Sequence, residues 1–116
     1  MTQLEEFIQG YIDCALWCSV DDNGTLVEDT YTANDLEPGT KAQMIEDCMA
    51  FWNTYKDRID DASQAGHDFW LTRNGHGAGF WDGNYPEEIG EILTQASHEY
   101  GKFDLYIDDN GSVFHF

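Results

Sequence analysis

Residues 67–82 have the sequence HDFWLTRNGHGAGFWD, in which an aromatic-rich run is followed by three alternating glycines. The run Phe69-Trp70-Leu71-Thr72 favours a β-strand, because aromatic and β-branched side chains fit a pleated, half-buried surface. Asn74-Gly75 is a preferred pair for a two-residue hairpin turn, because both turn residues must take positive φ. The pattern therefore predicts two paired strands between His67 and Asp82.

Two helices are predicted on the N-terminal side of this hairpin. Thr2-x-x-Glu5 is a capping box, and apolar residues follow it at helical spacing, so we expect a helix over Thr2 to Trp17. Residues 18–37 are acidic and predict a loop with a short hairpin turn at Asn23-Gly24. Thr40-x-x-Gln43 is a second capping box and predicts a helix over Lys41 to Asp60.

The C-terminal part of the chain predicts a third helix and a second hairpin. Pro86 precedes two glutamates and starts the helix, which Gly101 ends. Strands over Phe103 to Ile107 and Ser112 to Phe116 follow, joined by an Asn-Gly turn. The sequence therefore predicts a single α+β domain over residues 1–116, with about three helices packed on one face of a small antiparallel sheet of two hairpins.

The composition of the chain is strongly acidic. Lys and Arg total 5 of the 116 residues and Asp and Glu total 23, which gives a formal net charge of −18. This charge argues against direct binding to nucleic acid or to an anionic membrane, because both require a basic face. Hydrophobic residues make up 41% and aromatic residues 15% of the chain, which argues against disorder.

The sequence favours a cytoplasmic protein without metal or cofactor. No segment approaches the roughly 18 apolar residues of a membrane-spanning helix, and two glutamates stand where a signal peptide would be basic. Cys14, Cys18 and Cys48 are an odd count and predict no disulfide framework. We assign them to core packing rather than to a zinc site, because Cys18 and Cys48 fall on apolar helix faces. The Asp-Asp-Asn-Gly turns do not match the ligand spacing of an EF-hand.

The distribution of charge is the main functional signal. The first 40 residues contain nine acids and no Lys or Arg. A domain of this size is roughly 35 Å across, and duplex DNA carries about 20 charges over that length. We therefore expect a DNA mimic that binds a basic, nucleic-acid-handling protein. The carboxylates expected to supply the binding field are Glu5, Glu6, Asp13, Asp21, Asp22, Glu28, Asp29, Asp35, Glu37, Glu46, Asp47, Asp57, Asp60 and Asp61.

The glycines at positions 75, 77 and 79 leave three interpretations open. On a strand they would form one bare face for close packing, which is the interpretation we favour. In a loop they would bind a partner, or their amides would form an anion nest. The third interpretation is an acid–base site made of Arg73, His76 and Asp82, although no pattern fixes the geometry of these three side chains. An enzyme of this kind, and an acidic accessory domain without a specific partner, are the alternatives to the DNA mimic.

Residues 68–82 resemble a motif of small, mostly uncharacterised bacteriophage-encoded proteins. Weaker similarity continues along the C-terminal half, to about residue 111, at Leu93-Thr94, Tyr100-Gly101, Asp104-Leu105-Tyr106 and Asp108-Asp109-Asn110-Gly111. In the family the motif usually runs on with a basic residue and glycines, whereas Gly83-Asn84-Tyr85-Pro86 follows here. The resemblance implies a phage origin and no particular activity.

Acidity and resemblance together lead to one functional hypothesis. We expect a non-enzymatic, phage-encoded inhibitor that acts in the cytoplasm of an infected bacterium. Its target would be a nucleic-acid-binding or defence protein of the host, such as a restriction or CRISPR component. The four tryptophans are compatible with a homodimer, and the sequence leaves the oligomeric state open.

Overall fold

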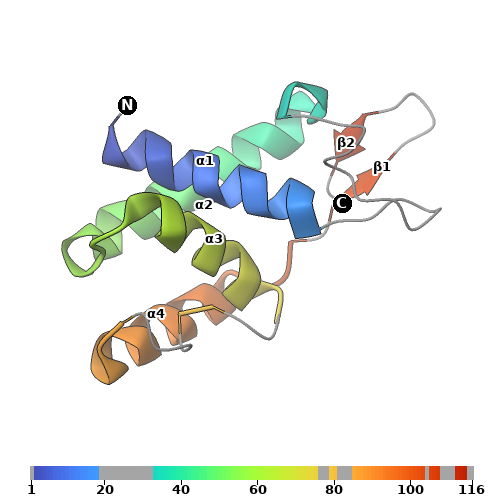
Figure 1. Ribbon diagram of the computed structural model, residues 1–116. Helices are drawn as coiled ribbons and strands as arrows, with labels where there is room; N and C mark the ends of the chain where they lie inside the picture. Colours follow the sequence, from blue (N-terminus) through green and yellow to red (C-terminus); the bar gives the residue numbers. More distant parts are fainter. Residues whose placement is uncertain are drawn as a thin grey trace.

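The computed structural model describes residues 2–18, 33–75, 79–80, 85–103, 105–107 and 112–114. Over these residues the chain forms helices and one small sheet (Figure 1). The helices are α1 (Gln3–Cys18), α2 (Pro38–Tyr55), α3 (Ala62–Arg73) and α4 (Glu87–Glu99), and the strands are β1 (Tyr106–Ile107) and β2 (Val113–Phe114). The 3₁₀ turns Ala33–Asp35 and Lys56–Arg58 flank α2. A search of these residues finds no helix with the length and apolar character needed to cross a membrane.

The predicted α+β class is wrong, because helices pack mainly on helices. The N-terminal part of the first predicted hairpin is helix α3, and residues 76–78 and 81–82 of that hairpin lie outside the described residues. The second predicted hairpin is confirmed as two short antiparallel strands, with Tyr106 opposite Phe114. This sheet has two residues in each strand and is too small to carry the helices.

Helix α3 forms although its sequence has strand propensity. The Asp61 carboxylate accepts a hydrogen bond from the Gln64 backbone N–H at 3.1 Å and caps the helix. Strand propensities span only about 1 kcal/mol, so burial of a helical face outweighs them. That face consists of residues at helical spacing, Ala62, Ala65, Gly66, Phe69 and Arg73.

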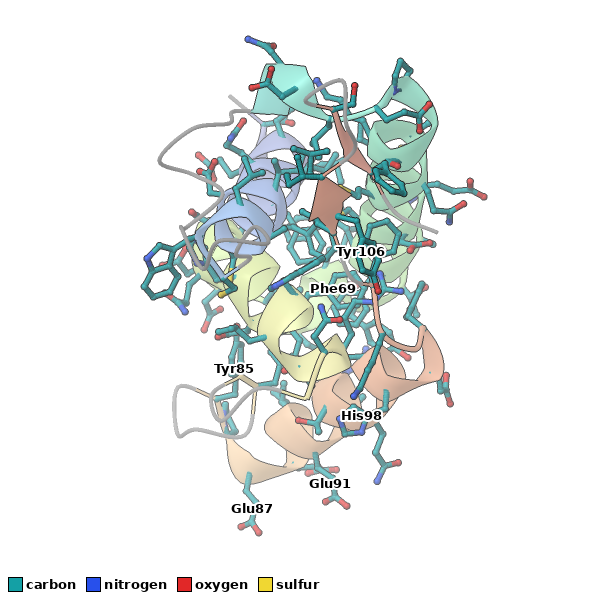
Figure 2. All side chains as sticks on the ribbon, turned by 90° about the vertical axis from the view of Figure 1, so that its right-hand side faces the viewer. Phe69, Tyr85, Glu87, Glu91, His98 and Tyr106 are labelled. Carbon is teal, nitrogen blue, oxygen red and sulfur yellow. The ribbon has the colours of Figure 1, made fainter. Side chains whose placement is uncertain are left out.

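Helices α1 and α3 cross in backbone contact. A Cβ atom at Gly66 would collide with the carbonyl oxygen of Phe7, and one at Gly10 would collide with the carbonyl oxygen of Ser63. Glycine at both positions therefore permits the close approach. The approach brings the Phe69 ring into the centre of the molecule (Figure 2), where it stacks on Phe51 at 4.2 Å between ring centroids.

Helices α1 and α4 lie close to their predicted bounds, whereas α2 begins three residues before and ends five residues before the predicted Lys41 to Asp60. Thr2 Oγ1 accepts a hydrogen bond from the Glu5 N–H at 3.1 Å, as the capping box predicts. The capping box predicted at Thr40 is wrong, because Glu37 caps α2 by accepting from the N–H groups of Gly39 and Thr40. The turn predicted at Asn23-Gly24 lies outside the described residues.

Candidate functional site

Arg73 lies at the C-terminal end of α3 and is buried, with 5% of its surface exposed. Its guanidinium donates to the Asp47 carboxylate at 3.0 Å and to the Tyr11 hydroxyl at 2.9 Å. It also donates to the carbonyl oxygens of Tyr100 at 3.0 Å and Gly101 at 2.8 Å. Arg73 therefore joins α3 to α1, α2 and the end of α4, and it lies on a buried helix end rather than on the strand pair predicted for residues 67–82.

Aromatic rings complete the surroundings of this guanidinium. The ring centroids of Phe69, Tyr100 and Phe103 lie 5.5, 5.6 and 5.2 Å from its central carbon. Burial raises the pKa of the Tyr11 hydroxyl far above its usual range, and the nearby Arg73 charge opposes this only in part. Tyr11 is therefore a neutral hydrogen-bond partner, and Asp47 provides the compensating negative charge.

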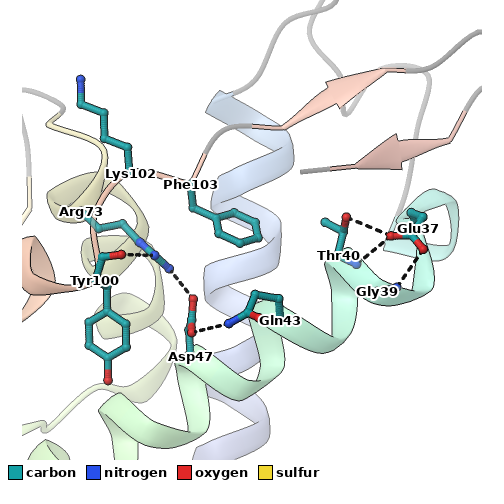
Figure 3. Close-up of a pocket in the computed structure, with 9 residues that line it drawn as sticks. All are labelled: Glu37, Gly39, Thr40, Gln43, Asp47, Arg73, Tyr100, Lys102 and Phe103. Atoms are coloured by element: carbon teal, nitrogen blue, oxygen red, sulfur yellow. Dashed lines mark hydrogen bonds and ion pairs between the residues drawn. The ribbon is translucent and has the colours of Figure 1, made fainter. Parts of the chain in front are cut away.

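A cavity of about 480 Å³ lies beside Arg73 (Figure 3). Gln43 Nε2 donates to the second Asp47 oxygen at 2.9 Å, so both oxygens of this carboxylate are bonded. Hydrogen bonds from the backbone N–H groups of Gly39, the larger contribution, and Thr40 hold the pKa of Glu37 below its usual value. Three charged groups of the wall, Glu37, Asp47 and Arg73, are therefore already engaged within the protein. The residues lining the cavity are Glu37, Gly39, Thr40, Gln43, Asp47, Arg73, Tyr100, Lys102 and Phe103.

Three of the carboxylates predicted to form the binding field have roles inside the fold. Glu37 caps α2, Asp47 pairs with Arg73, and Asp61 caps α3. The remaining predicted carboxylates in the described part are exposed or half-buried: Glu5, Glu6, Asp13, Asp35, Glu46, Asp57 and Asp60. Four further predicted carboxylates, and the loop-site residues His76 and Asp82, lie outside the described residues: Asp21, Asp22, Glu28 and Asp29.

The exposed acids receive little neutralisation from the chain's own cations. All five Lys and Arg residues fall in the described ranges, and only Arg73 forms a salt bridge there, with Asp47. The other four cations are Lys41, Lys56, Arg58 and Lys102. The surface carboxylates therefore project an almost unopposed negative field.

Helix α4 carries acids that the sequence analysis did not select. Glu87, Glu88, Glu91 and Glu99 are all exposed. Glu87 and Glu91 are four residues apart and so lie on one face of the helix, a spacing that was visible in the sequence. They were not predicted because the carboxylates selected for the binding field all lie within the first 61 residues.

A cavity of about 590 Å³ lies against this face of α4. Figure 2 shows Tyr85, Glu87, Glu91 and His98 around α4 at one end of the molecule. We call this the α4 cavity, and the described residues that line it are Phe80, Tyr85, Glu87, Gly90, Glu91, Thr94, Gln95 and His98.

A third cavity, of about 440 Å³, lies on another side of Tyr85 and brings further acids to the same end of the molecule. Three acids and one base from the α2–α3 connection, Asp57, Asp60, Asp61 and Arg58, line it together with Tyr85. We call the carboxylates that line the two cavities the acidic end, which consists of Asp57, Asp60, Asp61, Glu87 and Glu91. Segments far apart in sequence therefore combine into one acidic surface.

The cysteines contribute to packing, as predicted. Cys14 and Cys48 are fully buried, and Cys18 packs against the core with its Sγ 3.7 Å from that of Cys14. Burial raises the pKa of both the Cys14 and the Cys48 thiol, which disfavours the thiolate form that metals bind. Within the described ranges, no group of three His, Cys, Asp or Glu side chains is placed to hold a metal ion.

No protein-family model, curated protein or solved structure matches the chain. Fold and charge nevertheless define a class: a small acidic helical domain whose surface carboxylates are almost unopposed by its own cations. The function is therefore argued from this geometry and charge.

Proposed function

We propose that this protein is a non-enzymatic acidic inhibitor that occupies the nucleic-acid-binding surface of a basic protein. The observation that supports this most strongly is the lack of internal neutralisation, because one Lys or Arg salt bridge joins the described residues of a chain with a net charge of −18. Unopposed carboxylates attract a basic cleft over a distance and speed its association.

The size of the molecule fits this role. Its principal extents are 44 × 27 × 22 Å. Duplex DNA carries about 26 charges over a length equal to the long axis, so the charge of the protein is of the same order. A basic cleft that accommodates a short duplex therefore meets a comparable charge density in this protein.

A role in acid–base catalysis has little support from the described residues. Arg73, one member of the suggested acid–base site, already donates to four acceptors inside the protein. Its function is then to hold the helices together. The resemblance of residues 68–82 to phage proteins supports a phage source and a host target such as a restriction or CRISPR component. Such a target would be met in the host cytoplasm.

Affinity capture tests the proposed function. The tagged protein is incubated with bacterial lysate at low salt, and bound proteins are eluted either with duplex DNA or with high salt. We expect one basic nucleic-acid-handling protein to be released by DNA. Release of many unrelated basic proteins would contradict the proposal, since it would mean that the acidic surface binds basic proteins nonspecifically.

Charge reversal then tests whether the carboxylates carry the interaction. The reversed variant is D13K/E46K/D57K/D60K, at four exposed positions without a cap or salt bridge. The matched control, D13E/E46D/D57E/D60E, keeps every charge. The reversed variant should lose capture and inhibition of the target, and the control should keep both. A reversed variant that folds and inhibits as well as the wild type would overturn the proposal.

A further inference from the structure

We propose that the α4 cavity binds one arginine side chain, supplied by the basic partner protein. The identity of the partner rests on the proposed function. The chemistry of the site rests on the cavity itself and can be tested without the partner.

The walls of the cavity are held in place by the fold. The Tyr85 hydroxyl donates to Asp68, a carboxylate that is 1% exposed, at 3.2 Å. The Phe80 and Tyr85 rings meet edge to face with centroids 5.3 Å apart. A Cβ atom at Gly90 would lie 2.8 Å from the Phe80 carbonyl oxygen, so this glycine lets the Phe80 backbone press against α4. The Tyr85 ring, packed on the buried Phe80 ring, is therefore held in place before any ligand arrives, which lowers the cost of binding.

The charge of the cavity is negative. Glu87 and Glu91 are exposed, and none of the described lining residues is Lys or Arg. Like charges four residues apart on a helix repel each other, and the Gln95 side chain offers Glu91 one hydrogen bond at 3.5 Å. A cation in the cavity would relieve this repulsion. Charge complementarity thus selects a positively charged occupant.

The surroundings of Arg73 show which cation this combination of groups suits. There, aromatic rings, a carboxylate, a hydroxyl and carbonyl oxygens enclose one guanidinium. The α4 cavity combines the half-buried Tyr85 ring, which the buried Phe80 ring supports from behind, with the carboxylates of Glu87 and Glu91. The same kinds of group therefore surround a volume that no Lys or Arg of the described lining occupies.

A hydroxyl in the wall lacks a hydrogen-bond partner. Thr94 Oγ1 is buried without one among the described residues, whereas the nearby Ser97 hydroxyl donates to the Leu93 carbonyl at 2.8 Å. Threonine in a helix populates two rotamers, and rotation about its Cα–Cβ bond exchanges hydroxyl and methyl. A guanidinium N–H in the cavity would then supply the missing partner.

Arginine fits this site better than lysine or an apolar side chain. Its guanidinium is planar, stacks on aromatic rings and is more weakly hydrated than an ammonium group. Arginine is also enriched among the residues that dominate binding energy at protein interfaces. An apolar side chain would leave both glutamates without a counter-charge.

The test uses a capped Gly-Arg-Gly peptide and its citrulline counterpart, which has nearly the same shape without the charge. Binding to the isolated full-length protein is followed by NMR chemical shifts. We expect the arginine peptide to shift the signals of Tyr85, Gly90 and Thr94 in a saturable manner, and the citrulline peptide to leave them in place. Equal shifts with both peptides, or shifts confined to other parts of the surface, would overturn the proposal.

Variants separate the cavity from general acidity. E87Q/E91Q removes two charges from the cavity, and the matched control D13N/E46Q removes two from α1 and α2. The first pair should weaken arginine-peptide binding about five- to tenfold, and the control should change it less than about twofold. Equal weakening by both pairs would mean that the peptide senses net charge alone and would refute a cavity site.

The two proposals fail in distinguishable ways. Loss of lysate capture in D13K/E46K/D57K/D60K, combined with no peptide binding at α4, would leave the inhibitor proposal standing and remove the arginine site. Peptide binding that depends on Glu87 and Glu91, with no DNA-displaceable partner in lysate, would do the reverse.

Discussion

The Arg73 site and the α4 cavity are built from similar groups but differ in where the positive charge comes from. At the first site the protein supplies its own guanidinium, and Asp47 is paired with it at 3.0 Å. At the second, Glu87 and Glu91 face a cavity whose described lining holds no Lys or Arg. One acidic chain therefore uses some carboxylates to stabilise the fold and leaves others to the solvent.

The carboxylates of this protein therefore have two different roles, one in the stability of the fold and one in the surface charge. Asp47 contributes through a geometry in which its two oxygens accept from Arg73 and Gln43. Apart from Asp61, which caps α3, the carboxylates of the acidic end form no cap or salt bridge among the described residues, and they add to a field that an external cation can neutralise. Substitutions at the two sites should consequently affect different measurements, unfolding at the first and binding at the second.

The largest effect is expected from Arg73→Met. The substitution leaves the Asp47 carboxylate, the Tyr11 hydroxyl and two carbonyl oxygens without their donor. Removing one partner of a buried ion pair costs about 3–5 kcal/mol, so the free energy of unfolding in urea should fall by that amount.

The double variant R73M/D47M provides the control for this prediction. It removes the unpaired charge as well, and part of the lost stability should return. If Arg73→Met costs less than about 1 kcal/mol, which is the range of exposed ion pairs, the guanidinium is not the structural cation described here.

The contrast also shows what the sequence could predict. The presence of α1, α2, α4 and the two C-terminal strands follows from local signals, mainly periodicity, although the cap predicted for α2 was wrong. α3 was missed because Phe69-Trp70-Leu71-Thr72 has strand propensity. The backbone of α1 against which Gly66 packs lies more than 50 positions earlier in the chain. A local pattern contains no information about such a partner.

The same limit applies to the candidate sites. Arg73 bonds to Tyr11, 62 positions away, and to Asp47, 26 positions away, so its burial could not be inferred from its neighbours in sequence. Total charge, by contrast, is a property of composition and needed no contact. The four-residue spacing of Glu87 and Glu91 was available as well, but its importance depends on the cavity beside it.

Gly90→Ala should have the next largest effect, because it acts on the wall of the α4 cavity. The added methyl group would lie 2.8 Å from the Phe80 carbonyl oxygen, so the wall must shift. Alanine favours a helix by up to about 1 kcal/mol, but overpacking costs about 1–3 kcal/mol. We expect a net loss of unfolding free energy together with weaker binding of the arginine peptide.

Gln95→Ala is the comparison for this substitution, because it changes an exposed position of the same helix. It should leave stability almost unchanged. Should Gly90→Ala be as stable as the wild type and bind the peptide equally well, the close packing of Phe80 on α4 would have no part in forming the cavity.

Acidification should weaken the cap of α2, which lies beside the Arg73 site. The pKa of Glu37 is lowered in the folded protein, so its contribution is present above the ordinary value of 4.5 and is lost as pH falls through the folded value. The stability difference between the wild type and Glu37→Gln should be largest at neutral pH and should shrink in acid. Urea unfolding of both proteins at neutral pH and in acid measures this difference in free energy. A difference that grows in acid would contradict the assignment of Glu37 as the cap.

The smallest effect on stability is expected where the effect on binding is large. In E87Q/E91Q the repulsion between two exposed glutamates disappears, which favours the helix, while the favourable interaction of Glu87 with the N-terminal dipole of α4 is also lost. The two changes oppose each other, so the free energy of unfolding should move by less than about 0.5 kcal/mol. A loss of 2 kcal/mol or more, roughly the range of a buried polar group that loses its partner, would show that these carboxylates support the fold as Asp47 does. An unchanged unfolding curve combined with weaker binding of the arginine peptide would instead show that Glu87 and Glu91 serve partner binding. Charges that do not stabilise the folded chain have an effect only when an external cation is bound.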